Sequence, residues 1–285
     1  MFMQNSKSRM TSYIYLILVP IIIAALGFGV GHVNYTIYLP VWFLNVVFMI
    51  IASWSLGLKA AKLKSKEDYN LAITAFFLIV PYIFISMFAG LGPPPETAVE
   101  WTEKATEQQV RYFFLVISGV FIAFGFIGLS NRLKTAGESL FSDLSSTAIL
   151  IAIPLFIANM LYWGFYLTEL FKILSSQNST NYPDWFLPTK QLFGLISVIE
   201  VALTYFATFA IVTALKKTGW LNATSYYFYL LFSFLAFVVI ILSAFFKDTF
   251  KIPGFAVSIP ASPFLMPYFI GVNLLKRVGN NQNKL

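Results

Sequence analysis

Residues 225–246 read SYYFYLLFSFLAFVVIILSAFF, an apolar stretch without a single charged residue. A helix needs about 20 apolar residues to cross a hydrocarbon core of roughly 30 Å, so this stretch is long enough to span a bilayer. Seven other stretches are of similar length and composition, although Pro260, Pro263 and Pro267 interrupt the last of them. The expected spans are about 12–32, 37–58, 71–92, 111–131, 147–171, 191–215, 225–246 and 256–275.

The composition of the whole chain agrees with this interpretation. Hydrophobic residues make up 58% of the chain and charged residues 11%, against roughly 45–50% and 25% in an ordinary soluble domain. A soluble protein of this length could not cover so much apolar surface, so the lipid bilayer must surround much of it. The sequence therefore predicts an all-α integral membrane protein, a polytopic bundle of about eight transmembrane helices that forms a single transmembrane domain over residues 1–285.

The distribution of basic residues predicts the orientation. If the N-terminus lies in the cytoplasm, 13 of the 19 Lys and Arg residues fall on the cytoplasmic side and six on the other side. Short cytoplasmic loops of membrane proteins carry such an excess of Lys and Arg. We therefore expect cytoplasmic N- and C-termini in a multi-pass protein of the cytoplasmic (plasma) membrane. The net charge of +7 then reflects topology and does not indicate a nucleic-acid partner.

The segment between the third and fourth spans has a composition of its own. Three consecutive prolines, 93–95, end the third span, because proline cannot continue a helix. Thr97 and Glu100 then form a capping-box pattern at the start of a new helix. We expect residues 96–110 to form an extracytoplasmic helical stalk that continues into the fourth span. The acidic residues that this stalk would present to a partner protein are Glu100, Glu103 and Glu107.

Two short matches suggest an internal repeat. The tripeptide Phe-Ile-Gly lies near the end of both the fourth span, at 126–128, and the eighth, at 269–271. Transporters are often built from such repeats, and a parallel 4+4 arrangement would pair residues 1–140 with 141–285. Chance similarity between spans rich in Phe, Leu and Ile is the alternative explanation.

Glu200 is the one acidic residue that no loop accommodates. At about 1.5 Å per residue from Lys190, it lies roughly 15 Å below the outer end of the sixth span, close to the midplane. A carboxylate there costs about 2.5–3.5 kcal/mol, so it should face protein or water rather than lipid. Residues on the same helical stripe are three or four positions apart. The polar residues of this stripe are Ser197, Glu200, Thr204 and Thr208.

Two roles for Glu200 remain open at this point. It could be a proton or cation site of a permeation pathway, or a hydrogen-bonded packing contact between helices. Asn45 in the second span, and Asn159 and Tyr162 in the fifth, could complete a polar cavity with it. Each of them could equally hold two helices together.

The residues that are missing exclude several classes of function. The chain has no cysteine, and its only histidine, His32, lies at the outer end of the first span. Cysteine nucleophiles, two-histidine metal sites and bis-histidine haem ligation are therefore excluded. We expect no cofactor, no metal and no enzymatic activity. The leading hypothesis is a small-solute or cation-coupled transporter with an intramembrane Glu; the alternative is a non-catalytic membrane subunit or scaffold that binds partner proteins through its extracytoplasmic loops.

Overall fold

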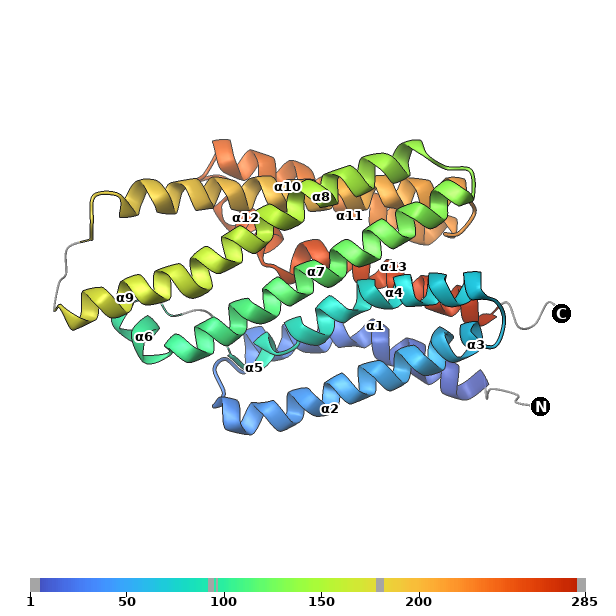
Figure 1. The fold of residues 1–285 in the computed structure, drawn as a ribbon, viewed down its shortest axis with the longest axis horizontal. Helices are drawn as coiled ribbons and strands as arrows, with labels where there is room; N and C mark the ends of the chain where they lie inside the picture. The colour runs from blue at the N-terminus through green and yellow to red at the C-terminus, as the bar shows by residue number, and fades with distance from the viewer. Residues whose placement is uncertain (1–5, 92–94, 96, 178–181, 281–285) are drawn as a thin grey trace.

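The computed structural model describes residues 6–91, 95, 97–177 and 182–280, and every regular element in these residues is a helix (Figure 1). Seven helical segments are long and apolar enough to cross a membrane. They are α1 (Ser6–Gly29), α2 (Tyr35–Ser53) with η1 (Trp54–Leu58) and α3 (Lys59–Lys62), α4 (Lys66–Ile85), α7 (Ala105–Thr135), α8 (Leu140–Leu161) with η2 (Tyr162–Tyr166) and α9 (Leu167–Ser176), α10 (Phe186–Lys217), and α11 (Ala223–Phe245).

The eighth candidate span is broken. The helices α12 (Lys251–Ser258) and α13 (Ala261–Asn280) pass the length and hydropathy test only as a pair, with a bend of 47° between them. The bend lies at Pro260, which is one of the three prolines that interrupt this stretch and which lacks the N–H that a continuous helix needs. Two short helices, α5 (Phe88–Leu91) and α6 (Ala98–Glu103), complete the described chain. An all-helical polytopic membrane bundle, as predicted, is therefore confirmed in architecture.

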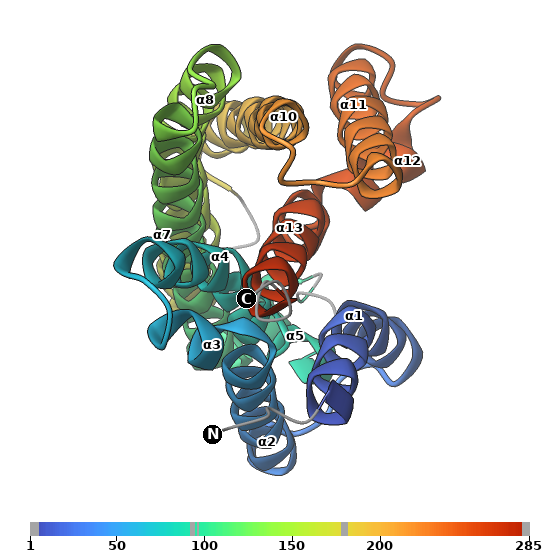
Figure 2. The ribbon, with the colours of Figure 1, turned by 90° about the vertical axis from the view of Figure 1, so that its right-hand side faces the viewer.

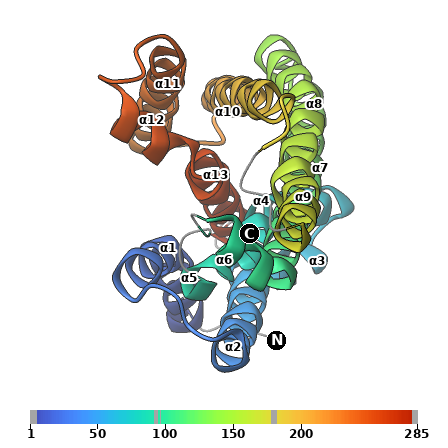
Figure 3. The same ribbon diagram turned by 90° about the vertical axis from the view of Figure 1, so that its left-hand side faces the viewer.

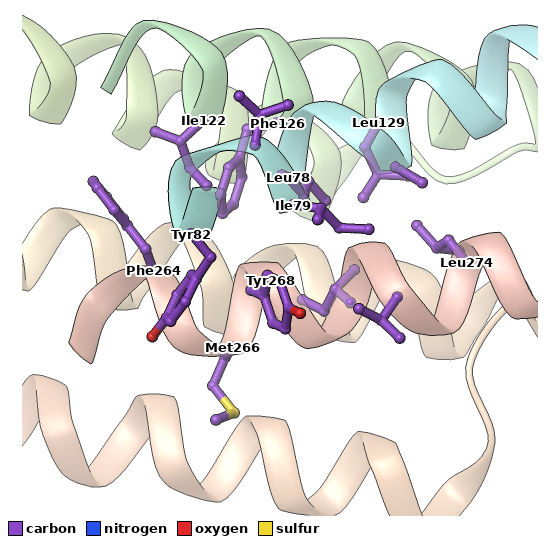
Figure 4. Close-up of a cluster of buried hydrophobic side chains, with 14 of the residues drawn as sticks. Leu78, Ile79, Tyr82, Ile122, Phe126, Leu129, Phe264, Met266, Tyr268 and Leu274 are labelled. Atoms are coloured by element: carbon purple, nitrogen blue, oxygen red, sulfur yellow. The ribbon is translucent and has the colours of Figure 1, made fainter. Parts of the chain in front are cut away.

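The broken helix α13 lies at the centre of the bundle, with α4 and α1 on one side and α10 and α11 on the other (Figure 2). Figure 4 shows the core where α13 meets α4 and α7. Tyr82 of α4 and Tyr268 of α13 pack there with ring centroids 4.7 Å apart and ring planes tilted by 44°. The Tyr268 hydroxyl donates a hydrogen bond to the backbone of Leu16 in α1, so its one polar atom is satisfied.

The outermost helices expose apolar faces. Large hydrophobic side chains on α1, α2 and α11, among them Ile21, Phe43 and Phe234, are half or more exposed. In water such faces would be unfavourable, whereas in lipid they are the expected surface of a membrane bundle.

The first and last long helices begin and end at the same end of the bundle (Figure 1). The Arg9 guanidinium at the start of α1 donates to Asn280 Oδ1 at the end of α13, at 2.8 Å. Other basic residues contact neighbouring segments at the same end. Lys64, which precedes α4, donates to the carbonyl of Val278, and Arg277 of α13 donates to the carbonyl of Gly219, which follows α10. We call this the basic end. The gathering of basic connections agrees with the expected topology, and the cytoplasmic assignment of this end stays a prediction.

The segment after the third long helix differs from the expected stalk. It is helical as α6 and the first turns of α7, but the helix is interrupted at Lys104, whose φ is −101° and ψ is 20°. The buried Trp101 fastens α6 to α9, because its indole N–H donates to Thr168 Oγ1 at 2.8 Å. The expectation of one continuous helix is wrong, because the helical backbone is interrupted at Lys104. The 4+4 repeat stays a prediction.

Candidate functional site

Glu200 lies on α10 and faces α8. Its side chain is only 3% exposed, and Asn159 Nδ2 of α8 donates to its Oε1 at 3.0 Å. Its second oxygen, Oε2, is buried and accepts no hydrogen bond from any described residue. The same holds for Asn159 Oδ1. An unpartnered buried polar atom is unfavourable, so this pair has hydrogen-bonding capacity left for another group.

The two threonines of the stripe bond to their own helix. Thr204 Oγ1 donates to the carbonyl of Glu200, and Thr208 Oγ1 donates to the carbonyl of Thr204, both at 2.8 Å. Their hydroxyl protons are therefore used, while their oxygen lone pairs remain able to accept.

A cavity of about 620 Å³ lies next to this pair. Four of the predicted residues line it, namely Asn159, Ser197, Glu200 and Thr204. Seven of the other lining residues are aromatic, namely Trp101, Tyr112, Phe156, Trp163, Phe250, Phe255 and Phe264. The helices that contribute most of the lining, α8, α10, α11, α12 and α13, surround the upper half of Figure 3, which views the molecule from the end opposite to the basic end.

The cavity reaches the surface at that opposite end. Lys247, which follows α11, and Lys251 and Phe255 of α12 line it and are exposed. Toward the basic end the cavity lining on α10 stops at Thr204. One turn further, Ser145 Oγ of α8 donates to the carbonyl of Ala207 at 2.8 Å, so α8 and α10 are in direct contact there. The lining on α10 therefore ends one turn before this contact.

The remaining predicted residues do not join this cavity. Asn45 accepts a hydrogen bond from the Tyr15 hydroxyl at 2.6 Å, so it connects α2 to α1. Tyr162 lies on η2 and stacks on Phe193 with ring centroids 3.9 Å apart, outside the cavity lining. Thr208 is fully buried one turn below the lining. Asn45 therefore has the alternative role, a contact between two helices.

A second buried polar group was missed by the sequence interpretation. Arg111 had been counted as an outer-loop charge, yet it is 3% exposed and donates to the carbonyl of Leu91 at 2.9 Å. Glu107 lies 3.6 Å from Arg111 and 3.1 Å from His32. Beside them, the fully buried Gln108 has no hydrogen bond from either amide atom to a described residue. The helical spacing of residues 107, 108 and 111, which places them on one face, was the signal from which this polar group could have been predicted.

Within the part of the chain that the structure describes, no three His, Asp or Glu side chains are grouped so that they could hold a metal ion. Comparison of the chain with protein-family models, with curated proteins and with solved structures found no match. Function must therefore be argued from the chemistry of the cavity itself.

Proposed function

We propose that this polytopic membrane protein is a transporter that binds a small solute in the cavity and uses Glu200 as a proton or cation site. The observation that carries the proposal is that Glu200 lines the cavity while its second carboxyl oxygen is buried and has no partner among the described residues. A carboxyl group that served packing alone would have both oxygens satisfied in a dry helix contact.

The size and shape of the cavity support the same reading. Small-molecule sites commonly have volumes of about 300–1,000 Å³ with apolar walls and a few polar groups, and this cavity has about 620 Å³ with aromatic walls around Asn159 and Glu200. It reaches the surface near Lys247 and Lys251, and its lining on α10 ends at Thr204, one turn before the contact of Ser145 with Ala207. This arrangement corresponds to one state of an alternating-access cycle.

The helices around the cavity contain the irregular segments that a second state requires. The π-helical η2 begins three residues after Asn159, Pro154 lies within α8, and the 47° bend separates α12 from α13. Such segments change direction at low cost because their backbone hydrogen bonds are already rearranged. They would allow the contact below Thr204 to open while the mouth closes.

The proposal is for binding and permeation rather than catalysis. Among the described side chains that line the cavity, the only hydrogen-bonded pair is Asn159 with Glu200, so no nucleophile is hydrogen-bonded to a base there. Nucleophilic catalysis would need such a pair.

Reaction with dicyclohexylcarbodiimide tests the role of Glu200. This apolar reagent modifies protonated carboxyl groups, so a site in exchange with solution should be labelled less as pH rises, and less when the cation it binds is added. We expect mass spectrometry to find an adduct on Glu200 that decreases at alkaline pH or with added Na⁺. Glu169→Gln, at an exposed carboxyl of the same end, is the matched control and should leave that adduct unchanged.

Substitutions at position 200 separate the coupling role from the packing role. Glu200→Gln should fold at normal yield and lose the adduct. Glu200→Leu leaves Asn159 Nδ2 without its acceptor and should lower the free energy of unfolding by about 0.6–2 kcal/mol. Labelling of wild-type Glu200 that depended on neither pH nor Na⁺ would contradict the proposal and leave a packing contact.

The hypothesis of a partner-binding subunit has less support from the geometry. Of the three acidic residues assigned to a partner, Glu107 already contacts His32 and Arg111. Glu100 and Glu103 remain at exposed positions of α6. Capture of a specific partner that Glu100→Gln with Glu103→Gln weakened, without a change in Glu200 labelling, would favour this hypothesis instead.

A further inference from the structure

The mouth of the cavity carries two positive charges. Lys247 and Lys251 both line the cavity and are exposed, and neither lies within ion-pair distance of a described carboxylate. Asp248 lies between them in the sequence but does not line the cavity. Among the residues that line it, Glu200 is the only acidic one. The mouth is therefore cationic, and the single carboxyl group lies deep inside.

The two lysines are held on one wall. Gly254 of α12 packs directly against Ser243 of α11, so closely that a Cβ at position 254 would collide with the Ser243 side chain. This contact turns α12 back along the end of α11 and fixes the backbone of Lys251 relative to that of Lys247. Lys247 and Lys251 are thus held in place by the packing of α12 on α11.

The depth and walls of the cavity indicate more than a bare ion. Along α10 its lining extends from Gly194 to Thr204, which corresponds to about 15 Å at 1.5 Å per residue. Aromatic rings such as Trp163 and Phe264 line the same cavity as Glu200 and the two lysines. Aromatic surface of this kind stabilises an apolar or planar body by burial and stacking. An inorganic anion would occupy only the mouth.

We infer that the solute is an amphipathic organic anion. Its acid group binds Lys247 and Lys251, its apolar body lies between the aromatic walls, and its inner end meets Asn159 and Glu200. This inference rests on the proposed function, because it names the class of solute that the same cavity takes. Ammonium groups of lysine form charge-assisted hydrogen bonds with carboxylates or phosphates, which gives the mouth its preference for acids.

Binding of two probes that differ only in charge tests the inference. The probes are 1-pyrenebutyrate and the uncharged 1-pyrenebutanol, and binding to the purified protein is measured by energy transfer from tryptophan to pyrene, since Trp101 and Trp163 line the cavity. We expect the butyrate to bind more tightly. Lys247→Gln with Lys251→Gln should raise its Kd about tenfold, the effect of losing partly exposed charge-assisted contacts, and leave butanol binding unchanged.

Lys172→Gln with Lys190→Gln is the matched control. It removes the same charge from the same end of the bundle, at lysines that do not line the cavity. The control should change the Kd of 1-pyrenebutyrate much less than the cavity variant. High salt should reduce the difference between the two probes, because exposed charges are screened.

The anion could come from the lipid or from solution, and nanodiscs distinguish these sources. Binding of 1-pyrenebutyrate is compared in phosphatidylcholine alone and in phosphatidylcholine with phosphatidylglycerol. If phosphatidylglycerol competes with 1-pyrenebutyrate, and this competition disappears in the Lys247→Gln, Lys251→Gln variant, the site binds an anionic lipid. If phosphatidylglycerol does not compete, the site binds a soluble acid. Either result keeps the inference of an anion.

Equal affinity for both probes, or wild-type affinity in the cavity variant, would overturn the inference. The two proposals fail separately. The lysine variant should retain pH-dependent labelling of Glu200. If binding of 1-pyrenebutyrate does not depend on the lysines while this labelling is intact, only the inference of an anionic solute fails. If binding depends on the lysines but labelling of Glu200 depends on neither pH nor Na⁺, the cavity binds an anion and Glu200 is not a coupling site.

Discussion

Gly271 of α13 lies so close to α4 that a Cβ at this position would collide with the backbone carbonyl oxygen of Ala75. A backbone atom cannot rotate away, so the two helices would have to separate. Gly271→Ala should lower the free energy of unfolding by about 1–3 kcal/mol, as overpacking does. Thermal unfolding in detergent measures this.

Gly194→Ala on α10 is the matched control for Gly271→Ala. A Cβ there meets no atom within 4 Å. Both substitutions gain the same helix propensity, so the difference between them isolates the packing term. Equal stabilities of the two variants would show that α4 and α13 do not approach each other so closely.

The residues of the cavity were predictable to different degrees. Glu200 and its stripe could be found because a carboxyl group stands out in an apolar span. Asn159 could be named as a possible partner, but the sequence could not separate it from Asn45, since this depends on which helices are neighbours. Lys247 and Lys251 lie in a predicted outer loop, and the sequence could not show that this loop folds back so that both lysines line the cavity.

The depth of Glu200 also depended on where α10 begins and ends. The count from Lys190 placed it near the midplane, but α10 extends from Phe186 to Lys217. Measured over the whole helix at about 1.5 Å per residue, Glu200 lies about 21 Å from Phe186 and about 26 Å from Lys217. It therefore lies close to the middle of α10, and the longer helix leaves the count from Lys190 nearly unchanged.

At the scale of elements, α6 is held to α9 by side-chain contacts, among them Thr102 Oγ1 with Ser175 Oγ at 3.3 Å. This six-residue helix is too short to be stable alone, and Trp101 holds it to α9 through Thr168. Trp101→Phe should remove about 0.5–1.5 kcal/mol by loss of the hydrogen bond. Amide exchange should then become faster within Ala98–Glu103 and not elsewhere in the bundle.

Trp185→Phe serves as the control for that experiment, because Trp185 is largely exposed. If α6 exchanged equally slowly in both variants, the indole contact would not be its anchor. The sequence predicted the start of α6 correctly, since Thr97 Oγ1 accepts from the N–H of Glu100 at 3.2 Å. It could not predict that Trp101 contacts Thr168, because these residues are 67 positions apart and meet only in the folded bundle.

At the scale of the whole molecule, the topology makes a prediction for every loop. Reporter fusions after Lys66, Lys134 and Lys217 should be cytoplasmic, and a fusion after Gln108 should be external. These positions alternate because the basic connections lie at one end. An internal reporter after Gln108 would contradict the topology.

The chain contains no cysteine, so single cysteines can confirm this topology without background labelling. Thr249→Cys, exposed beyond α11, should react with a membrane-impermeant maleimide in intact cells. Ala136→Cys, exposed in a basic connection, should react only after permeabilisation. The reverse pattern would place the cavity mouth in the cytoplasm.

The number of spans could be predicted from length and hydropathy, but their arrangement could not. The stretch with three prolines had the weakest signal as a span, yet α13 occupies the centre (Figure 2). Hydropathy reports how well a helix tolerates lipid, and a helix surrounded by protein does not need that property. The signal is weakest at α13 because α13 has the fewest lipid contacts to satisfy.

The central place of α13 also has a consequence in time. A chain is synthesised from its N-terminus, so α4 and α7 enter the membrane before α13 has left the ribosome. Until then the surfaces that α13 will cover, including Leu78 and Ile79, face lipid or another protein. The centre of the bundle is thus filled after all the other described helices have been made. A nascent chain that stalls before Ala261 therefore lacks the central helix against which the others pack.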